Sequence, residues 1–165
     1  MLGRILILTL TPALGTFALF RTADLRINTS GSLPVGLYIV SPKGSFVEFC
    51  PDDHSLSAQR HYRARGVCPD GAAPLLKPLV GKSGDQIVMS PAGVAVNGKL
   101  LPHTAPLSHD SEGRPLAHWP FGSYTTAPGM LWVASSYNSR SYDSRYLGPI
   151  RECAVRSRLR SLVAW

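Results

Sequence analysis

Charged side chains are scarce in this chain, and so are aromatic ones. Only 16% of its 165 residues are charged and 8% are aromatic, whereas 44% are hydrophobic. Disordered chains have the opposite balance, with many charged and few apolar residues. This composition therefore excludes an intrinsically disordered protein. The length allows a single domain with a modest hydrophobic core.

Cysteine is equally sparse, with three residues at Cys50, Cys68 and Cys153. None of them belongs to a C-x-x-C pair, the spacing typical of zinc and redox centres, so we expect neither a metal nor a cofactor. In an exported domain, a disulfide between Cys50 and Cys68 would stabilise the fold by about 3 kcal/mol and leave Cys153 unpaired. In a reducing compartment, we expect three buried thiols instead.

Acidic residues are outnumbered by basic ones, 10 against 17, which gives a net charge of +7 and an isoelectric point near 9.7. Such a charge attracts anionic surfaces such as phospholipid headgroups or nucleic acid. The basic side chains are spread thinly before residue 151. The chain therefore lacks the dense basic patch of a nucleic-acid-binding protein, and we expect no nucleic-acid partner.

Glycine and proline, by contrast, are abundant, with 15 and 14 residues. They favour short strands and turns over long helices and predict a mainly β fold. Asn97-Gly98, between two apolar runs, predicts a hairpin. The expected strands are 36–40, 45–50, 75–81, 85–89, 93–96, 99–101 and 130–134. We expect a surface excursion or short helix over 51–73, a loop over 102–129, and a closing strand or basic amphipathic tail over 151–165.

The first residues resemble a targeting segment. Arg4 precedes an apolar run over residues 5–20, as in an export signal or a membrane anchor. The run is shorter than the ~20 residues that span a bilayer, and no clean A-x-A cleavage site follows it. We expect a signal peptide or anchor over 1–22 and one domain over 23–165. The alternative is a buried helix, for which Pro12 and Gly15 are poorly suited.

The stretch from Asn28 to Tyr38 is the first candidate for chemistry, and it contains Ser30-Gly31-Ser32-Leu33-Pro34. Gly31 permits a close backbone approach, and Pro34 disfavours helix for the residue before it. Such a turn can hold a hydroxyl rigidly at a strand edge with free amides around it. The same residues are also compatible with an ordinary loop.

Lys77 lies between Leu75-Leu76 and Leu79-Val80, in an otherwise apolar strand. One interpretation is a snorkelling side chain whose aliphatic stem lies along the sheet. The other is a buried amine whose pKa is lowered from about 10.4 to roughly 7–8, which makes it a base near neutrality. A neutral lysine can take the proton of a serine hydroxyl.

A third block runs from Ser141 to Gly148 and contains two small hydroxyls, Asp143 and Arg145. These groups can form a hydrogen-bonded corner in which Ser141 orients Lys77. A solvated turn with a surface ion pair is the alternative.

In this order, the three blocks resemble the sequence boxes of bacterial type I signal peptidases. The match is closer still to their conjugative-transfer relatives, the TraF peptidases, which share the pattern Asn-x-Thr/Ser-x-Ser-x-Pro-x-Gly-x-Tyr with residues 28–38. Residues 77–85 resemble the second box, residues 93–98 fit the same superfamily, and residues 141–148 resemble the last box.

The resemblance implies a signal-peptidase-like β domain behind an N-terminal membrane helix, acting as a serine endopeptidase with a Ser-Lys dyad. Ser32 matches the nucleophile and Lys77 matches the general base. The hydroxyl of Ser30 and the amide of Ser32 match the oxyanion hole. The supporting positions are Ser141, which orients the lysine, and the ion pair of Asp143 and Arg145.

Two departures from the pattern affect these assignments. Pro34 stands two residues after Ser32, where ordinary signal peptidases have it at three, and this favours the TraF branch. Lys82-Ser83 replaces the usual Leu-Pro before Gly84-Asp85, so Lys82 competes for the role of base. Its position relative to Gly84-Asp85 favours Lys77.

Histidine offers a rival mechanism, a Ser-His-Asp triad. The candidates all lie in polar, loop-like stretches where surface histidine is the commoner explanation, so the dyad is preferred. They are His61, His103, His109 and His118.

By resemblance, the expected substrate is a membrane-tethered conjugative pilin precursor, with hydrolysis and head-to-tail cyclisation both open. The expected location is the periplasm, at the outer face of the bacterial inner membrane, beside other transfer-apparatus proteins. Two alternatives remain: a general type I signal peptidase that cleaves many exported precursors, and a non-catalytic component of a conjugation apparatus.

Overall fold

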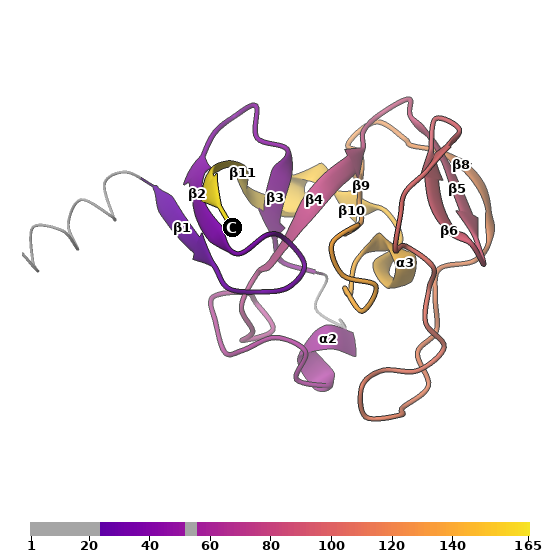
Figure 1. Ribbon diagram of the computed structural model, residues 1–165, viewed down its shortest axis with the longest axis horizontal. Helices are drawn as coiled ribbons and strands as arrows, with labels where there is room; N and C mark the ends of the chain where they lie inside the picture. Colours follow the sequence, from indigo (N-terminus) through magenta and orange to yellow (C-terminus); the bar gives the residue numbers. More distant parts are fainter. Residues whose placement is uncertain (1–23, 52–55) are drawn as a thin grey trace, which may run out of the picture.

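The fold consists of two antiparallel sheets connected by long loops (Figure 1). The computed structural model describes residues 24–51 and 56–165. The expected N-terminal membrane helix lies outside these residues. Within them, no helix has both the length and the apolar character needed to cross a bilayer.

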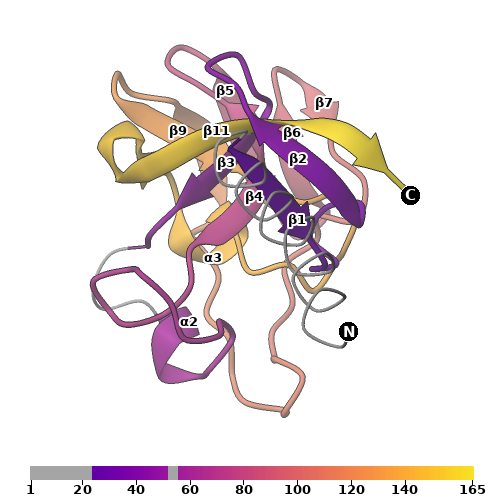
Figure 2. The same cartoon turned by 90° about the vertical axis from the view of Figure 1, so that its left-hand side faces the viewer.

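The larger sheet has seven strands and carries the N- and C-terminal parts of the described chain. In spatial order its strands are β1 (Leu25–Asn28), β2 (Gly36–Val40), β11 (Val155–Ala164), β3 (Phe46–Phe49), β4 (Leu75–Gly81), β9 (Met130–Val133) and β10 (Ile150–Arg151). The long strand β11 pairs with β3 through its first half and with β2 through its second, as Figure 2 shows. It therefore joins the two halves of the sheet.

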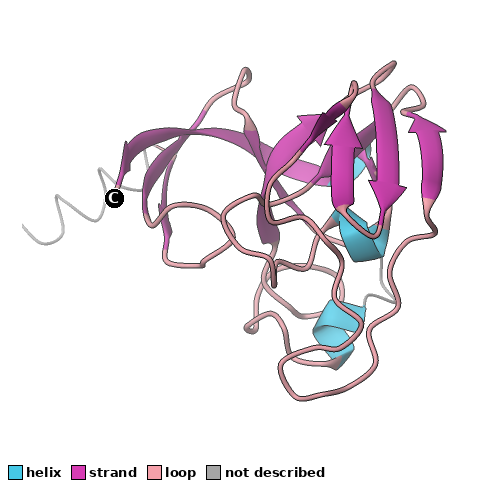
Figure 3. Ribbon diagram, turned by 45° about the vertical axis from the view of Figure 1, so that its right-hand side comes forward, coloured by secondary structure: helices cyan, strands magenta, loops and turns pink. Residues whose placement is uncertain are grey.

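The smaller sheet has four strands and is seen from its face in Figure 3. Its spatial order is β7 (Lys99–Leu100), β6 (Gly93–Val96), β5 (Gln86–Ser90) and β8 (Gly122–Thr125). The predicted hairpin at Asn97-Gly98 is confirmed: both residues have positive φ, 49° and 81°, and they join β6 to β7.

Three apolar clusters hold the sheets together. One lies on the larger sheet around Val47 and Phe49, and one lies on the smaller sheet around Ile87 and Met89. Trp132 of β9 belongs to the second cluster, so a strand of the large sheet anchors the small one. The third cluster consists of Leu33, Tyr38 and Leu159. It places a buried leucine directly after Ser32, which fixes the turn at that residue to the core.

The predicted mainly β architecture is confirmed, but three strands were not predicted from the sequence: β1, β8 and the two-residue β10. β1 is a short edge strand whose Ile27 side chain is 68% exposed, so it has no clear apolar alternation. β8 falls within the expected loop 102–129, and its residues are mostly exposed and polar. It is held by backbone pairing with β5, a long-range contact that a local pattern does not reveal.

The helical elements are short. α2 (Leu56–Gln59) lies in the polar excursion after β3, α3 (Ser144–Leu147) lies in the last polar block, and a 3₁₀ turn covers Glu152–Ala154. Of the two alternatives for the C-terminal segment, the structure has the closing strand, because Leu159 is fully buried in the sheet.

Cys50 and Cys68 are joined by a disulfide across the excursion that contains α2. Arg63 reinforces this excursion from inside: it pairs with Asp70 and donates hydrogen bonds to Ser57 Oγ (3.0 Å) and Ala73 O (3.0 Å). The excursion is therefore tied to the sheet at β3. Cys153 is exposed and free.

Reducing the disulfide is expected to lower the free energy of unfolding by about 3 kcal/mol, because the bond constrains an unfolded loop of 18 residues. Urea denaturation of a Cys50→Ala/Cys68→Ala variant measures this loss. Cys153→Ser is the matched control and should leave stability unchanged, since its side chain is exposed. Rapid alkylation of both Cys50 and Cys68 in native, unreduced protein would contradict the prediction.

Candidate active site

The turn that carries Ser32 is built around Asn28, the last residue of β1. Its side chain is only 5% exposed, and its amide nitrogen donates to the carbonyl oxygens of Ser30 (3.0 Å), Leu33 (3.3 Å) and Pro34 (3.1 Å). One buried amide thus fixes three carbonyl groups of the turn.

Two further contacts fix the backbone around Ser32. Ser135 Oγ donates to the Ser32 carbonyl (2.6 Å), and Tyr38 OH donates to the Pro34 carbonyl (2.7 Å). With these carbonyls turned toward protein donors, the Ser32 N–H keeps no hydrogen-bond partner among residues 24–51 and 56–165. A free, immobile N–H beside a hydroxyl is what an oxyanion hole needs.

Lys77 reaches Ser32 from β4. The strand pairs Lys77 with Val47 of β3, and the lysine side chain is 4% exposed. Its Nζ lies 2.6 Å from Ser32 Oγ and 2.9 Å from Ser141 Oγ. Residues that are 45 and 64 positions apart in sequence therefore meet at one amine.

Burial lowers the pKa of the Lys77 ammonium from 10.5 to about 8, because desolvation disfavours the charged form. The carboxylate of Asp143 acts against this shift, and the guanidinium of Arg145 acts with it. A substantial share of the lysine is therefore uncharged at mildly alkaline pH. In that form the amine can accept the proton of the Ser32 hydroxyl.

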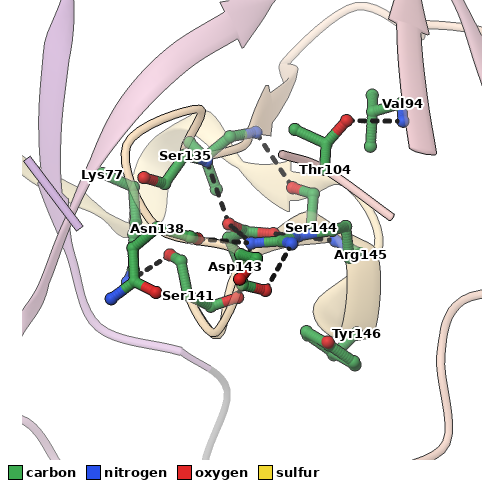
Figure 4. A network of polar contacts seen from close by, with 12 residues as sticks. Lys77, Val94, Thr104, Ser135, Asn138, Ser141, Asp143, Ser144, Arg145 and Tyr146 are labelled. Carbon is green, nitrogen blue, oxygen red and sulfur yellow. Dashed lines mark hydrogen bonds and ion pairs between the residues drawn. The ribbon is translucent and has the colours of Figure 1, made fainter. Parts of the chain in front are cut away.

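A buried ion pair supports the lysine from the other side (Figure 4). Asp143 and Arg145 both have fully buried side chains, and Arg145 Nε donates to Asp143 Oδ1 (2.9 Å) while Nη2 donates to Oδ2 (2.9 Å). Asp143 also accepts from the Ser135 N–H (3.0 Å). The pair is thus connected through Ser135 to the carbonyl of Ser32.

The guanidinium of Arg145 also holds the loop before Ser141. It donates to the carbonyl oxygens of Ser139 (2.9 Å) and Ser141 (2.8 Å), and more weakly to that of Asn138 (3.4 Å). These bonds fix the backbone on both sides of Ser141. Ser141 can therefore orient the Lys77 amine.

α3 begins and ends in ways that keep the ion pair in place. Asp143 caps its N-terminus by accepting from the Arg145 N–H (3.2 Å). Gly148 ends it with φ of 70°, and a Cβ there would lie 2.4 Å from Trp119 Cε3. Only glycine combines that backbone with that closeness, which explains the last residue of the block.

A cleft of about 340 Å³ opens beside Ser32, Lys77 and Ser141. Its far side consists of the excursion after β3 and the loop that contains Asp110. Tyr62 OH donates to Asp110 Oδ2 (2.6 Å), which joins the two segments.

Two other candidates from the sequence, Lys82 and Ser30, do not contact Ser32 Oγ. Lys82 is exposed in the turn after β4, away from the cleft lining. Ser30 is exposed, and its hydroxyl donates to Asn28 Oδ1 (2.7 Å), so it must rotate before it can serve an oxyanion.

Within the described residues, the histidines offer no partner for Ser32. Of the four candidates, His61 and His109 line the cleft, while His103 and His118 contact backbone carbonyls. None of the four has a hydrogen bond to Ser32. Across the described part of the chain there is also no cluster of side chains suited to a metal ion.

Ser135 and Asn138 were missed by sequence reasoning. Ser135 lies 103 positions from the carbonyl it contacts, in a polar stretch of several serines. Asn138 lines the cleft beside the turn that carries Ser32. No local pattern distinguishes either residue from an ordinary loop residue.

Comparison with known proteins gives three findings. The family described as signal peptidase, peptidase S26, matches residues 2–165. Two plasmid transfer proteins TraF from Escherichia coli are 36% and 35% identical over 150 residues, which is 87% of this chain and 85% and 84% of theirs. A probable conjugal transfer protein TraF from Sinorhizobium fredii (strain NBRC 101917 / NGR234) is 33% identical over 152 residues, 87% of this chain and 79% of that protein.

Among solved structures, a signal peptidase I from Enterococcus faecalis V583 is 19% identical with a TM-score of 0.39. The likeness covers 72% of this chain and 96% of that chain.

Proposed function

This chain belongs to the S26 family of signal peptidases, and from that premise we propose that it is a serine endopeptidase whose catalytic pair is Ser32 and Lys77. The observation that carries the proposal is the 2.6 Å contact between Lys77 Nζ and Ser32 Oγ in a buried setting. A buried amine next to a hydroxyl at the edge of a cleft is the arrangement of an activated nucleophile.

The reaction starts from uncharged Lys77. Its Nζ takes the proton of the Ser32 hydroxyl as Oγ attacks the carbonyl carbon of the scissile peptide bond. The negative charge moves to the carbonyl oxygen, where the Ser32 N–H stabilises it by about 3–4 kcal/mol. Lys77 then passes its proton to the leaving amine, the C–N bond breaks, and an ester to Ser32 remains.

The ester is resolved by a second nucleophile. Water attacks it with Lys77 as base, which yields a free carboxylate and restores Ser32. An amine of the same substrate can attack instead, and the product is then a ring closed by a new amide bond. Both routes use the same residues.

We propose that the substrate is a pilin precursor processed during conjugal transfer. The support comes from the relatives, which are named as plasmid and conjugal transfer proteins TraF. We further propose that the enzyme acts in the periplasm, at the outer face of the inner membrane. The disulfide supports an oxidising compartment, because such bonds do not persist in a bacterial cytosol.

The test is incubation of the purified full chain with a pilin precursor. Wild type is expected to process it, and Ser32→Ala is expected to remain folded and lose processing. Ser83→Ala is the matched control, because Ser83 is an exposed serine outside the cleft lining. Processing by Ser32→Ala would overturn the proposal.

Two further assays, one with unrelated exported precursors and one of conjugation in cells, separate the alternatives. A general signal peptidase also cleaves unrelated exported precursors. A non-catalytic transfer component supports conjugation even with Ser32→Ala. Mass spectrometry of the product separates hydrolysis from ring closure, since a ring is lighter than the hydrolysed product by one water.

A further inference from the structure

The two acidic side chains that line the cleft beside Ser32 are already paired with arginines. Asp110 Oδ2 accepts a hydrogen bond from Arg114 Nε (2.6 Å) and lies 3.4 Å from Arg60 Nη1. Glu112 forms an ion pair with Arg114 Nη1 (2.9 Å). Neither carboxylate is therefore left to attract a basic group of a substrate.

The same cleft is lined by one lysine and two arginines, and one of these three side chains has no partner. Lys77 Nζ contacts Ser32 Oγ. Arg60 Nη1 donates to the Pro115 carbonyl (2.8 Å). For the guanidinium of Arg140, the described part of the chain provides no hydrogen bond, ion pair or ring contact. Because a guanidinium is not deprotonated in proteins, the cleft contains one permanent positive charge that is not neutralised.

The backbone that carries Arg140 is fixed on both sides. The Arg140 N–H donates to Asn138 Oδ1 (2.8 Å), and the Ser141 N–H donates to the Asn138 carbonyl (3.1 Å). The buried guanidinium of Arg145 donates to the carbonyl oxygens of Ser139 (2.9 Å) and Ser141 (2.8 Å). The side chain of Arg140 therefore starts from a rigid turn, which lowers the entropy lost when a ligand orders it.

Arg140 begins close to the proposed reacting centre. It directly precedes Ser141, and consecutive Cα atoms are about 3.8 Å apart. Ser141 Oγ lies 2.9 Å from Lys77 Nζ, which in turn lies 2.6 Å from Ser32 Oγ. A peptide whose scissile bond lies at Ser32 therefore occupies the same cleft as Arg140. The unpaired charge is placed to contact the residues next to that bond.

The chemistry of a guanidinium determines which group it binds. Its planar fork matches the two oxygens of a carboxylate and forms short, charge-assisted hydrogen bonds with them. In a peptide, a carboxylate occurs in the side chains of aspartate and glutamate and at the C-terminus. Because a bound peptide partly shields such a pair from water, the pair is stronger than an ion pair on an open surface.

We propose that Arg140 determines substrate specificity by binding a carboxylate of the peptide close to the scissile bond. This inference rests on the proposed peptidase activity and adds a chemical requirement to its substrate. Ser32 and Lys77 carry out the reaction on the bound peptide, and Arg140 selects which peptides bind well.

The first test compares matched peptides in steady-state kinetics. The reference is a peptide from the processing site of a pilin precursor, in which glutamate or glutamine is placed in turn at each position around the scissile bond. Wild type is expected to prefer glutamate at one position by roughly tenfold in kcat/KM, mainly through a lower KM, because glutamine loses a charged hydrogen bond that forms on binding. A further pair of peptides, with a free and an amidated C-terminus, shows whether a terminal carboxylate is the group bound.

Variants then assign the preference to Arg140. Arg140→Gln should process the glutamate and glutamine peptides equally well, and Arg140→Glu should prefer a lysine peptide at the same position. This reversal distinguishes recognition from a structural role, because a loosened loop would slow all peptides alike. Arg160→Gln is the matched control. Arg160 is exposed, lies outside the cleft lining and contributes the same charge, so this variant should keep the wild-type preference.

The outcomes separate this inference from the function on which it rests. If wild type processes the peptides but prefers no glutamate or free-acid peptide by more than about twofold in kcat/KM, Arg140 binds no carboxylate and the peptidase assignment stands. A preference that persists in Arg140→Gln also overturns the inference, and its loss in His61→Gln instead assigns the carboxylate to that basic side chain of the cleft. If Ser32→Ala still processes the peptides, both proposals fall.

Discussion

The Lys77→Met variant is expected to lose about 10²–10⁴-fold in turnover and to resist urea better than wild type. The loss follows from removing the only amine that contacts Ser32 Oγ in the described chain, since a positioned base contributes about 10²–10⁴-fold. The gain in stability follows from removing a buried ammonium whose pKa is lowered from 10.5 to about 8. Such a shift corresponds to a burial cost on the order of 3 kcal/mol below pH 8.

The stability difference between Lys77→Met and wild type depends on pH, because Lys77 has different pKa values in the folded and unfolded chain. Between pH 8 and 10.5, the unfolded chain carries a proton on Lys77 that the folded chain has lost, so wild-type stability rises with pH across this window. Methionine does not titrate. The advantage of Lys77→Met should therefore be largest below pH 8 and fade toward pH 10.5, as urea denaturation at several pH values will measure.

In wild type, activity should depend on the protonation state of Lys77. kcat/KM is expected to rise with pH, tenfold per unit well below the pKa of about 8, and to level off above it, because the uncharged amine is the proposed base. A profile that is flat from pH 6 to 10 would contradict the assignment.

Lys82→Met is the matched control for Lys77→Met. Lys82 is an exposed lysine five positions further along the chain, outside the cleft lining. Its replacement should change neither turnover nor stability. A loss of turnover in Lys82→Met together with normal turnover in Lys77→Met would transfer the role of base to Lys82.

Arg145→Met is expected to lower the free energy of unfolding by about 3–5 kcal/mol. The reason is that the carboxylate of Asp143, fully buried, would lose its cation and remain uncompensated. The carbonyl oxygens of Ser139 and Ser141 would also lose their donor, so the loop that orients Lys77 should loosen and turnover should fall. Urea denaturation and kinetics measure the two effects.

Two controls define this prediction. Asp143→Leu/Arg145→Met removes both charges and should cost less than the sum of the single losses, since no unpaired charge is left buried. Arg158→Met removes an arginine from the partly exposed pair with Glu152 and should cost no more than about 1 kcal/mol. An Arg145→Met variant as stable as Arg158→Met would show that the buried pair does not organise the fold.

The sequence was most informative where a residue conflicts with its neighbours. Lys77 is prominent because a charge in an apolar strand calls for an explanation, and the structure places it at Ser32. Asn97-Gly98 predicted its hairpin because few residues accept positive φ at both positions. In both cases the physical constraint, a buried charge or a positive φ, can be recognised from neighbouring residues in the sequence.

The resemblance to known peptidases was needed elsewhere. Nothing local distinguishes the Asp143–Arg145 pair from a surface ion pair, although both side chains are fully buried. β8 was missed because its residues are polar and only its pairing with β5 orders it. Asn138 was missed because its position depends on the absence of a side chain at Gly31, more than a hundred positions away. Such long-range contacts are decided by tertiary structure.

The position of β11 has a consequence for the timing of activity. β2 and β3 follow each other along the chain, yet this ten-residue strand is inserted between them and pairs with both. The turn that carries Ser32 precedes β2 and Lys77 lies in β4, so in the order of the sheet they sit on opposite sides of β11. A chain in which β11 has not yet paired with β2 and β3 therefore lacks the brace between the two halves, and we expect it to be unable to hold Ser32 against Lys77.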